Sequence, residues 1–160
     1  MSSDQQIQAL ISGPVFSFSD GLHQTLPLAA HGVYTIWKGS QFLYVGIGGR
    51  GLDLTIAHKK KRGLKDRLDS HWSGRRSGDQ FAIYVFDRFI VPNLTDEQRR
   101  QFETGELQGD SLTRSFILKY LSYRFLVTQS YKEAMAIETR LARGRTSAGF
   151  PLLNPQRDNS

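Results

Sequence analysis

The sequence contains no cysteine, which excludes disulfide bonds and metal sites built from thiolates. No apolar run approaches the roughly 20 residues that are needed to span a bilayer. The start, MSSDQQIQALISG, lacks the basic flank and the long apolar stretch of a secretory signal. There is also no internal repeat and no low-complexity tract. We therefore expect a cytoplasmic protein without a membrane partner.

The size and composition are those of one folded domain. The chain has 160 residues, of which 39% are hydrophobic, and domains typically run to about 100–200 residues. We expect an N-terminal extension over residues 1–30, one domain over residues 31–155 and a C-terminal tail over residues 156–160. No chemistry is assigned to the extension.

The net charge of +6 is concentrated in one segment. Residues 57–76 carry eight basic residues against Asp66 and Asp69, which accounts for the whole excess. A single lysine in such a run is normally a solvated side chain, but a run this dense is typical of a surface that binds a polyanion. An acidic stretch follows over residues 96–110.

Hydrophobic periodicity predicts a mixed α/β (α+β) fold. We expect strands over residues 33–37, 42–47, 81–91 and 123–127, the third of them ended by Pro92. We expect helices over residues 63–76, 95–107, 111–121 and 131–142. Two capping boxes, Thr95 with Gln98 and Ser130 with Glu133, mark the starts of the second and fourth helices.

A glycine cluster, Gly46-Ile47-Gly48-Gly49-Arg50-Gly51, matches the GxGxxG pattern of dinucleotide-binding proteins. That site needs a helix starting at the glycines and an acidic residue at the end of the next strand. Neither is predicted here, because a basic loop follows and the preceding strand belongs to a hairpin. A nucleotide-binding protein is therefore a weaker alternative.

Three polar residues stand out on the predicted helices. Arg67 and His71 are spaced i, i+4 and so share a helix face beside the apolar stripe. Glu138 lies on the stripe formed by Ala134, Ile137 and Leu141, which should face the core. A buried carboxylate is costly unless it is paired or binds a metal.

These residues, with two tripeptides and one asparagine, resemble the GIY-YIG nuclease superfamily. The resemblance covers about residues 31–155 and is carried by Gly32-Val33-Tyr34, Tyr44-Val45-Gly46, Arg67, His71, Glu138 in EAMAIETRL and Asn154 in PLLNP. It implies a small domain with a central antiparallel sheet flanked by helices. It also implies a divalent-metal-dependent endonuclease that hydrolyses DNA phosphodiester bonds, as restriction-type or stand-alone members do. RNA is not excluded as a substrate.

The resemblance also implies a role for each residue. Glu138 would bind Mg²⁺ or Mn²⁺, and Arg67 would hold a phosphate oxygen. Tyr34, with Tyr44 beside it, would orient or deprotonate the attacking water. His71 would share the proton transfer or bind a phosphate, and Asn154 would position the substrate backbone or the glutamate. The basic residues expected to contact nucleic acid are Lys59, Lys60, Lys61, Arg62, Lys65, Arg75 and Arg76.

Two further expectations can be checked in a structure. The spacing from His71 to Glu138 is long for the family, so an insertion is expected within residues 92–128. A two-residue Gly39-Ser40 turn would send Tyr34 and Tyr44 to opposite faces of the sheet. A shared site therefore requires an odd-length loop, of three residues including Gly39, or a bulge that restores the register. Both hydroxyls should then lie on the face that receives Arg67 and Glu138. The main alternative is a non-catalytic nucleic-acid-binding module on the same scaffold.

Overall fold

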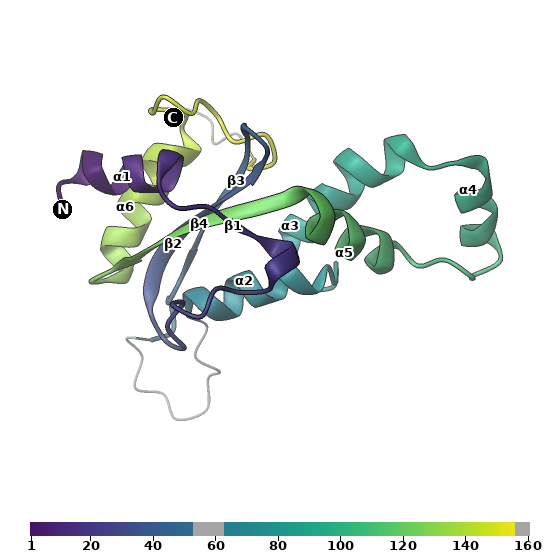
Figure 1. The fold of residues 1–160 in the computed structure, drawn as a ribbon, viewed down its shortest axis with the longest axis horizontal. Helices are drawn as coiled ribbons and strands as arrows, with labels where there is room; N and C mark the ends of the chain where they lie inside the picture. The colour runs from purple at the N-terminus through teal and green to yellow at the C-terminus, as the bar shows by residue number, and fades with distance from the viewer. Residues whose placement is uncertain (53–62, 156–160) are drawn as a thin grey trace.

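A computed structural model describes residues 1–52 and 63–155 and shows a four-stranded antiparallel sheet with helices on both faces (Figure 1). The strand order is β1-β4-β2-β3, so β3 is an edge strand. The predicted α+β class and central antiparallel sheet are thus confirmed. The strands are β1 (Phe16–Ser17), β2 (His31–Lys38), β3 (Gln41–Gly48) and β4 (Leu121–Thr128).

Residues 1–52 and 63–155 form six α-helices. They are α1 (Ser3–Ser12), α2 (Leu64–Ser73), α3 (Gln80–Val85), α4 (Asp96–Glu103), α5 (Gly109–Tyr120) and α6 (Tyr131–Ala142). Short 3₁₀ turns occur at η1 (Phe18–Asp20) and η3 (Val91–Asn93), and a π-helical turn, η2 (Phe86–Ile90), continues α3. The capping box predicted at Thr95 is present, and Ser130 caps α6 by accepting from the Glu133 amide.

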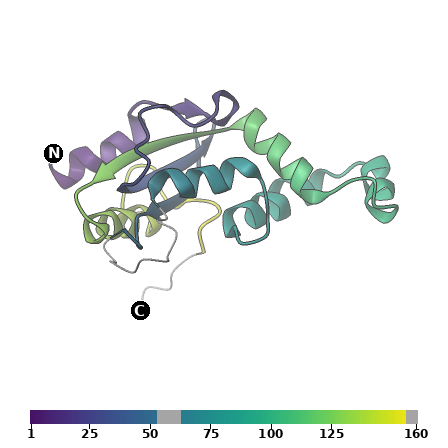
Figure 2. The ribbon, with the colours of Figure 1, turned by 90° about the horizontal axis from the view of Figure 1, so that it is seen from below.

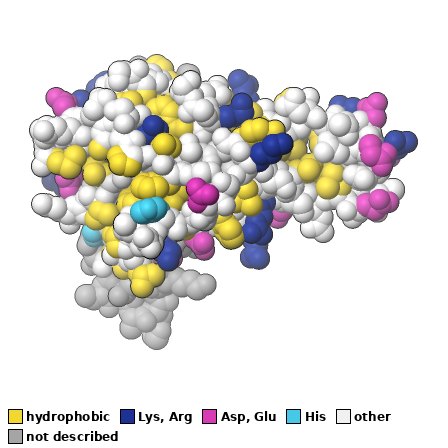
Figure 3. Space-filling view, in the orientation of Figure 1, with side chains coloured by type: hydrophobic (Ala, Val, Ile, Leu, Met, Phe, Trp, Pro, Cys, Tyr) yellow, Lys and Arg dark blue, Asp and Glu magenta, His cyan; other side chains and the backbone are white. Residues whose placement is uncertain are grey.

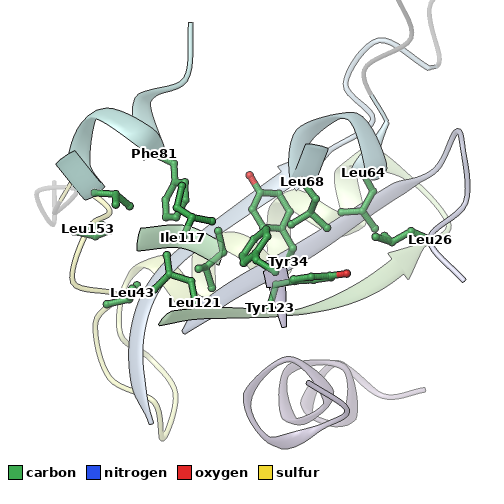
Figure 4. Close-up of a cluster of buried hydrophobic side chains, with 13 residues drawn as sticks. Leu26, Tyr34, Leu43, Leu64, Leu68, Phe81, Ile117, Leu121, Tyr123 and Leu153 are labelled. Atoms are coloured by element: carbon green, nitrogen blue, oxygen red, sulfur yellow. The ribbon is translucent and has the colours of Figure 1, made fainter. Parts of the chain in front are cut away.

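The two faces of the sheet carry two separate cores, as the alternation of side chains along β2 requires. Tyr34 and Ile36 point to the face covered by α2, α3 and α5, where they pack with Leu64 and Leu68 (Figure 4). Val33 and Trp37 point to the opposite face, which α1 and α6 cover. The helix α2 is therefore separated from α6 by the thickness of the sheet.

Residues 1–30 are packed onto the domain rather than projecting from it. Ile7 and Leu10 of α1 are buried in the second core, and β1 pairs with β4 through Phe16 and Tyr123. This segment completes both a core and an edge of the sheet.

The strand predicted over residues 81–91 is wrong, because this segment is helical. Asp79 caps α3 by accepting from the Phe81 amide at 3.1 Å. Phe81 and Val85 are spaced i, i+4 and are buried together, as on one face of a helix. The aromatic and β-branched residues favoured a strand in the sequence, but burial of this helical face and the cap determine the structure.

An arm built from η2, η3, α4 and the start of α5 extends away from the sheet (Figure 1, right). Figure 3 shows acidic side chains gathered at its far end, where Asp96 and Glu97 open α4. The range within which an insertion is expected, residues 92–128, contains most of this arm and also β4, which is a central strand of the sheet. The insertion itself stays a prediction.

The hairpin contains a bulge, one of the two devices expected for it. Lys38 pairs with Gln41, so the turn has two residues, and Gly39 adopts φ +58° within it. The register then shifts between Ile36 and Trp37, where Leu43 is the extra residue on β3. As a result Ile36 pairs with Tyr44, and Tyr34 pairs with Gly46 rather than facing Tyr44 directly. The odd-length loop is absent, but the two tyrosines lie on the same face.

Candidate active site

Four of the six candidate catalytic residues meet at a cavity of about 320 Å³ along the edge strand β3. Its wall is formed by Tyr44 and Gly46 of β3, Arg67 of α2, Glu138 of α6 and Asn154 of the C-terminal segment. Figure 2 shows this C-terminal segment passing close to α3 beneath α2. Four segments that are distant in the sequence thus contribute the predicted polar side chains to one hollow.

Glu138 reaches this cavity from the opposite side of the sheet. The helix α6 packs on the second core, whereas Arg67 and the two tyrosines belong to the first face. The expectation that one face receives all of them is therefore wrong for Glu138. Glu138 and Arg67 can still reach the same cavity, because β3 is an edge strand and side chains from both faces of the sheet can meet beyond it. Glu138 is 7% exposed.

Tyr34 lies behind the cavity, with its ring fully buried in the first core. The close approach of Gly46 makes room for it, because a Cβ at Gly46 would lie 2.2 Å from Tyr34 Oη and 2.4 Å from its Cζ. The two motif tripeptides are therefore coupled by contact: the tyrosine of the first occupies the space left by the glycine of the second. Tyr44, by contrast, lines the cavity itself.

His71 connects Tyr34 to a carboxylate that the sequence motif does not include. Its Nε2 lies 2.6 Å from Tyr34 Oη, and its Nδ1 lies 2.7 Å from Oδ2 of Asp79. His71 is fully buried, and Asp79 is 3% exposed. Burial lowers the pKa of His71 despite the opposing effect of Asp79, so this ring is neutral near pH 7.

Burial also raises the pKa of both tyrosines above the ordinary value of 10.0. Arg67 opposes this effect at each of them through its positive charge. Both phenols are therefore protonated near pH 7.

Asn154 binds the backbone of β3. Its Oδ1 accepts from the Val45 amide at 2.8 Å and its Nδ2 donates to the Val45 carbonyl at 2.9 Å. With the Leu152 and Leu153 amides, which donate to Phe42 and Leu43 carbonyls, it fastens the C-terminal segment along the edge of the sheet. A substrate-positioning role for Asn154 stays a prediction.

The predicted nucleic-acid contacts are only partly described. Lys59, Lys60, Lys61 and Arg62 lie outside the described residues. Lys65 is on α2, and Arg75 is exposed just after it. Arg76 is engaged within the protein, since its Nε donates to Asp110 at 2.8 Å and its guanidinium lies 4.3 Å from the Phe86 ring centre.

Sequence reasoning missed three residues of the site: Asp79, Gln80 and Tyr84. Gln80 and Tyr84 line the cavity from α3, and Asp79 begins that helix. The sequence did contain a signal for a helix here, because an aspartate two residues before Phe81 stands where an N-cap residue would begin a helix. Reading residues 81–91 as a strand concealed it.

Among the described residues that line the cavity, Glu138 is the carboxylate that could bind a metal. Within residues 1–52 and 63–155 there is no group of three or more His, Asp or Glu side chains arranged to hold a metal ion. Mg²⁺ keeps several waters and often takes only one or two protein carboxylates, so Glu138 beside a cavity of this size fits such an ion. None of the helices in the same residues is long and apolar enough to cross a membrane.

Comparison with known proteins does not place the chain in a family. No family model, no curated protein and no solved structure matches it.

Proposed function

We propose that the protein is a divalent-metal-dependent endonuclease that hydrolyses phosphodiester bonds of DNA. The observation that carries this proposal is the cavity at the edge of β3, where Tyr44, Arg67, Glu138 and Asn154 come together from four segments. This combination matches the chemistry that the sequence resemblance implies.

Each side chain has a task that its position supports. Glu138 would hold the metal ion, which when bound would polarise the scissile phosphate and stabilise the leaving 3′ oxygen. Arg67 binds a non-bridging phosphate oxygen through its guanidinium and offsets the negative charge that develops in the transition state. Both side chains line the cavity.

Tyr44 is the tyrosine placed to contact the attacking water, because its side chain lines the cavity. Tyr34 is fully buried, and its hydroxyl is directed at His71. For Tyr34 to deprotonate the water, as the sequence suggested, its hydroxyl would have to gain access to the cavity. We therefore assign the attacking water to Tyr44 rather than to Tyr34.

Variants of α6 test the assignment of the carboxylate. Glu138→Gln keeps the size of the side chain but removes its charge, so DNA cleavage should fall by at least a hundredfold while DNA binding persists. Glu133→Gln is the matched control, because Glu133 is on the same helix and its carboxylate bonds the Gln6 side chain and the Gln129 amide instead. Full activity of Glu138→Gln would refute the metal role. DNA binding without cleavage by the unaltered protein would favour the non-catalytic module.

A further inference from the structure

Another cavity, the arm cavity, lies where the arm joins the sheet (Figure 1). Lys38 ends β2 and pairs with Leu121, and Tyr120 directly precedes Leu121 at the end of α5. The volume of the arm cavity is about 400 Å³, and small-molecule sites typically have roughly 300–1,000 Å³. None of the described residues that line it also lines the candidate active site. Its wall includes Lys38, Phe89, Asn93, Gln98, Phe116 and Tyr120.

Three aromatic rings form the apolar part of this wall. The Phe89 and Phe116 rings are stacked, with their centres 5.0 Å apart and their planes at 14°. The centre of the Tyr120 ring lies 5.0 Å from that of Phe116. Tyr120 is 48% exposed, so its ring is accessible to a ligand. Aromatic side chains of this kind bind any nucleobase by stacking, because every base has a π face.

Two side-chain amides in the wall are oriented by their partners within the protein. Asn93 Nδ2 donates to the Phe89 carbonyl at 2.9 Å, so Oδ1 is left as an acceptor. Gln98 Oε1 accepts from the Thr95 amide at 3.0 Å in the capping box of α4, so Nε2 is left as a donor. Neither remaining end is bonded within residues 1–52 and 63–155. The Watson–Crick edge of every nucleobase carries donors and acceptors that could bond such groups.

Positive charge lies beside the exposed ring. The Nζ atoms of Lys38 and Lys119 lie 6.0 Å and 5.1 Å from the centre of the Tyr120 ring. No aspartate or glutamate is among the described residues that line the arm cavity. The charge of this region is therefore complementary to the phosphate that is attached to a base.

We propose that the arm cavity binds one unpaired nucleobase of a DNA strand, stacked on the aromatic rings, with its phosphate beside Lys38 and Lys119. An apolar side chain of a protein partner would fit the rings, but it would bury the Gln98 amide without a hydrogen bond, which is costly. A base inside a continuous duplex is stacked and paired, so it would first have to leave the helix.

The proposal rests on the proposed function in taking DNA as the partner. It adds a substrate class to that function, namely DNA with an unpaired nucleotide. Such a nucleotide enters the cavity at a lower cost than a paired one, because no base pair has to be broken.

The test compares two labelled duplexes that differ only in the base of one nucleotide. One duplex carries a bulged deoxyadenosine, and the other carries an abasic nucleotide at the same position. Fluorescence anisotropy in EDTA, at one salt concentration, gives the Kd of each without any cleavage. We expect the duplex with the base to bind about 5–150-fold more tightly, since stacking on aromatic side chains contributes about 1–3 kcal/mol per base.

Two variants connect this ratio of affinities to the arm cavity. Tyr120→Ala removes the exposed ring, and Gln98→Glu keeps an oxygen for the Thr95 amide but replaces the donor with a carboxylate oxygen. The ratio should fall toward one in both variants. Gln101→Glu is the matched control, because it adds the same charge to α4 at a residue that does not line the arm cavity. It should keep the ratio of the unaltered protein.

Equal affinity for the two duplexes, or binding to neither, overturns the proposal. So does a ratio that is unchanged in Gln98→Glu, which decides the matter alone if Tyr120→Ala does not fold. If free dAMP displaces the bulged duplex as effectively as unlabelled bulged duplex does, the ligand is a free nucleotide and the assignment to DNA is overturned. Absence of cleavage with Mg²⁺ would contradict the proposed function alone, because the ratio is measured without a metal.

Discussion

Gly46→Ala should damage the site through one methyl group. The new Cβ would lie 2.2 Å from Tyr34 Oη and 2.4 Å from its Cζ, well inside van der Waals contact. The end of a side chain can often move aside, but Tyr34 is fully buried and is bonded to His71 at 2.6 Å. Forcing an extra methyl group into a packed core costs about 1–3 kcal/mol. Loss of the bond to His71 adds roughly 1–3 kcal/mol, since a buried nitrogen loses its partner.

Because both effects act on one ring, we expect a net loss of about 2–4 kcal/mol in the free energy of unfolding. Urea denaturation followed by circular dichroism measures it. Gly51→Ala is the control, because a Cβ there has no atom within 4 Å and the φ angle is not in the left-handed region. If Gly46→Ala unfolds within about 0.5 kcal/mol of Gly51→Ala, the tight contact between the two motif tripeptides is not real.

Three other changes give separate tests. Asn154→Ala removes both hydrogen bonds to Val45 and should lower the free energy of unfolding by about 1–2 kcal/mol. Asn93→Ala, which loses one exposed hydrogen bond to Phe89, should lower it less. Equal urea midpoints for the two variants would show that Asn154 does not fasten the C-terminal segment to β3. Burial lowers the pKa of His71 below 6.5, so the His71 ring binds a proton less readily in the folded state than in the unfolded state. The folded protein should therefore be most stable, with respect to this group, above pH 6.5, and should lose stability as the pH falls below that value and His71 is forced to bind a proton. An NMR titration in which His71 protonates at or above pH 6.5 would contradict this. Replacing Lys59, Lys60 and Lys61 by Ala should make DNA binding less dependent on salt, because each contact with a phosphate contributes about −0.9 to the slope of log K against log salt concentration. An unchanged slope would show that these lysines do not contact the DNA backbone.

The sequence predicted the parts of the fold that have strong local signals. The hairpin of β2 and β3, the α6 helix with Ser130 at its start and the strand near residue 125 follow from periodicity and caps. The bulge at Leu43 could be inferred only because two tyrosines had to share a face. In each of these cases the local pattern and the tertiary structure favour the same conformation.

Other features depended on tertiary contacts that a local pattern does not contain. Residues 81–91 have the composition of a strand but form a helix, because Asp79 caps it and the buried face of Phe81 and Val85 packs on the first core. The position of Glu138 beyond the edge of β3 depends on the strand order. The contact of Asp79 with His71 was missed for the same reason, since the two residues belong to different helices.

We propose that the cavity at the edge of β3 hydrolyses DNA with the help of a metal bound by Glu138. Incubation of the purified protein with supercoiled plasmid, with Mg²⁺ in one sample and EDTA in the other, tests it most directly. We expect nicked and linear plasmid only in the sample with Mg²⁺. Intact plasmid in both samples, or equal cutting in both, would contradict it.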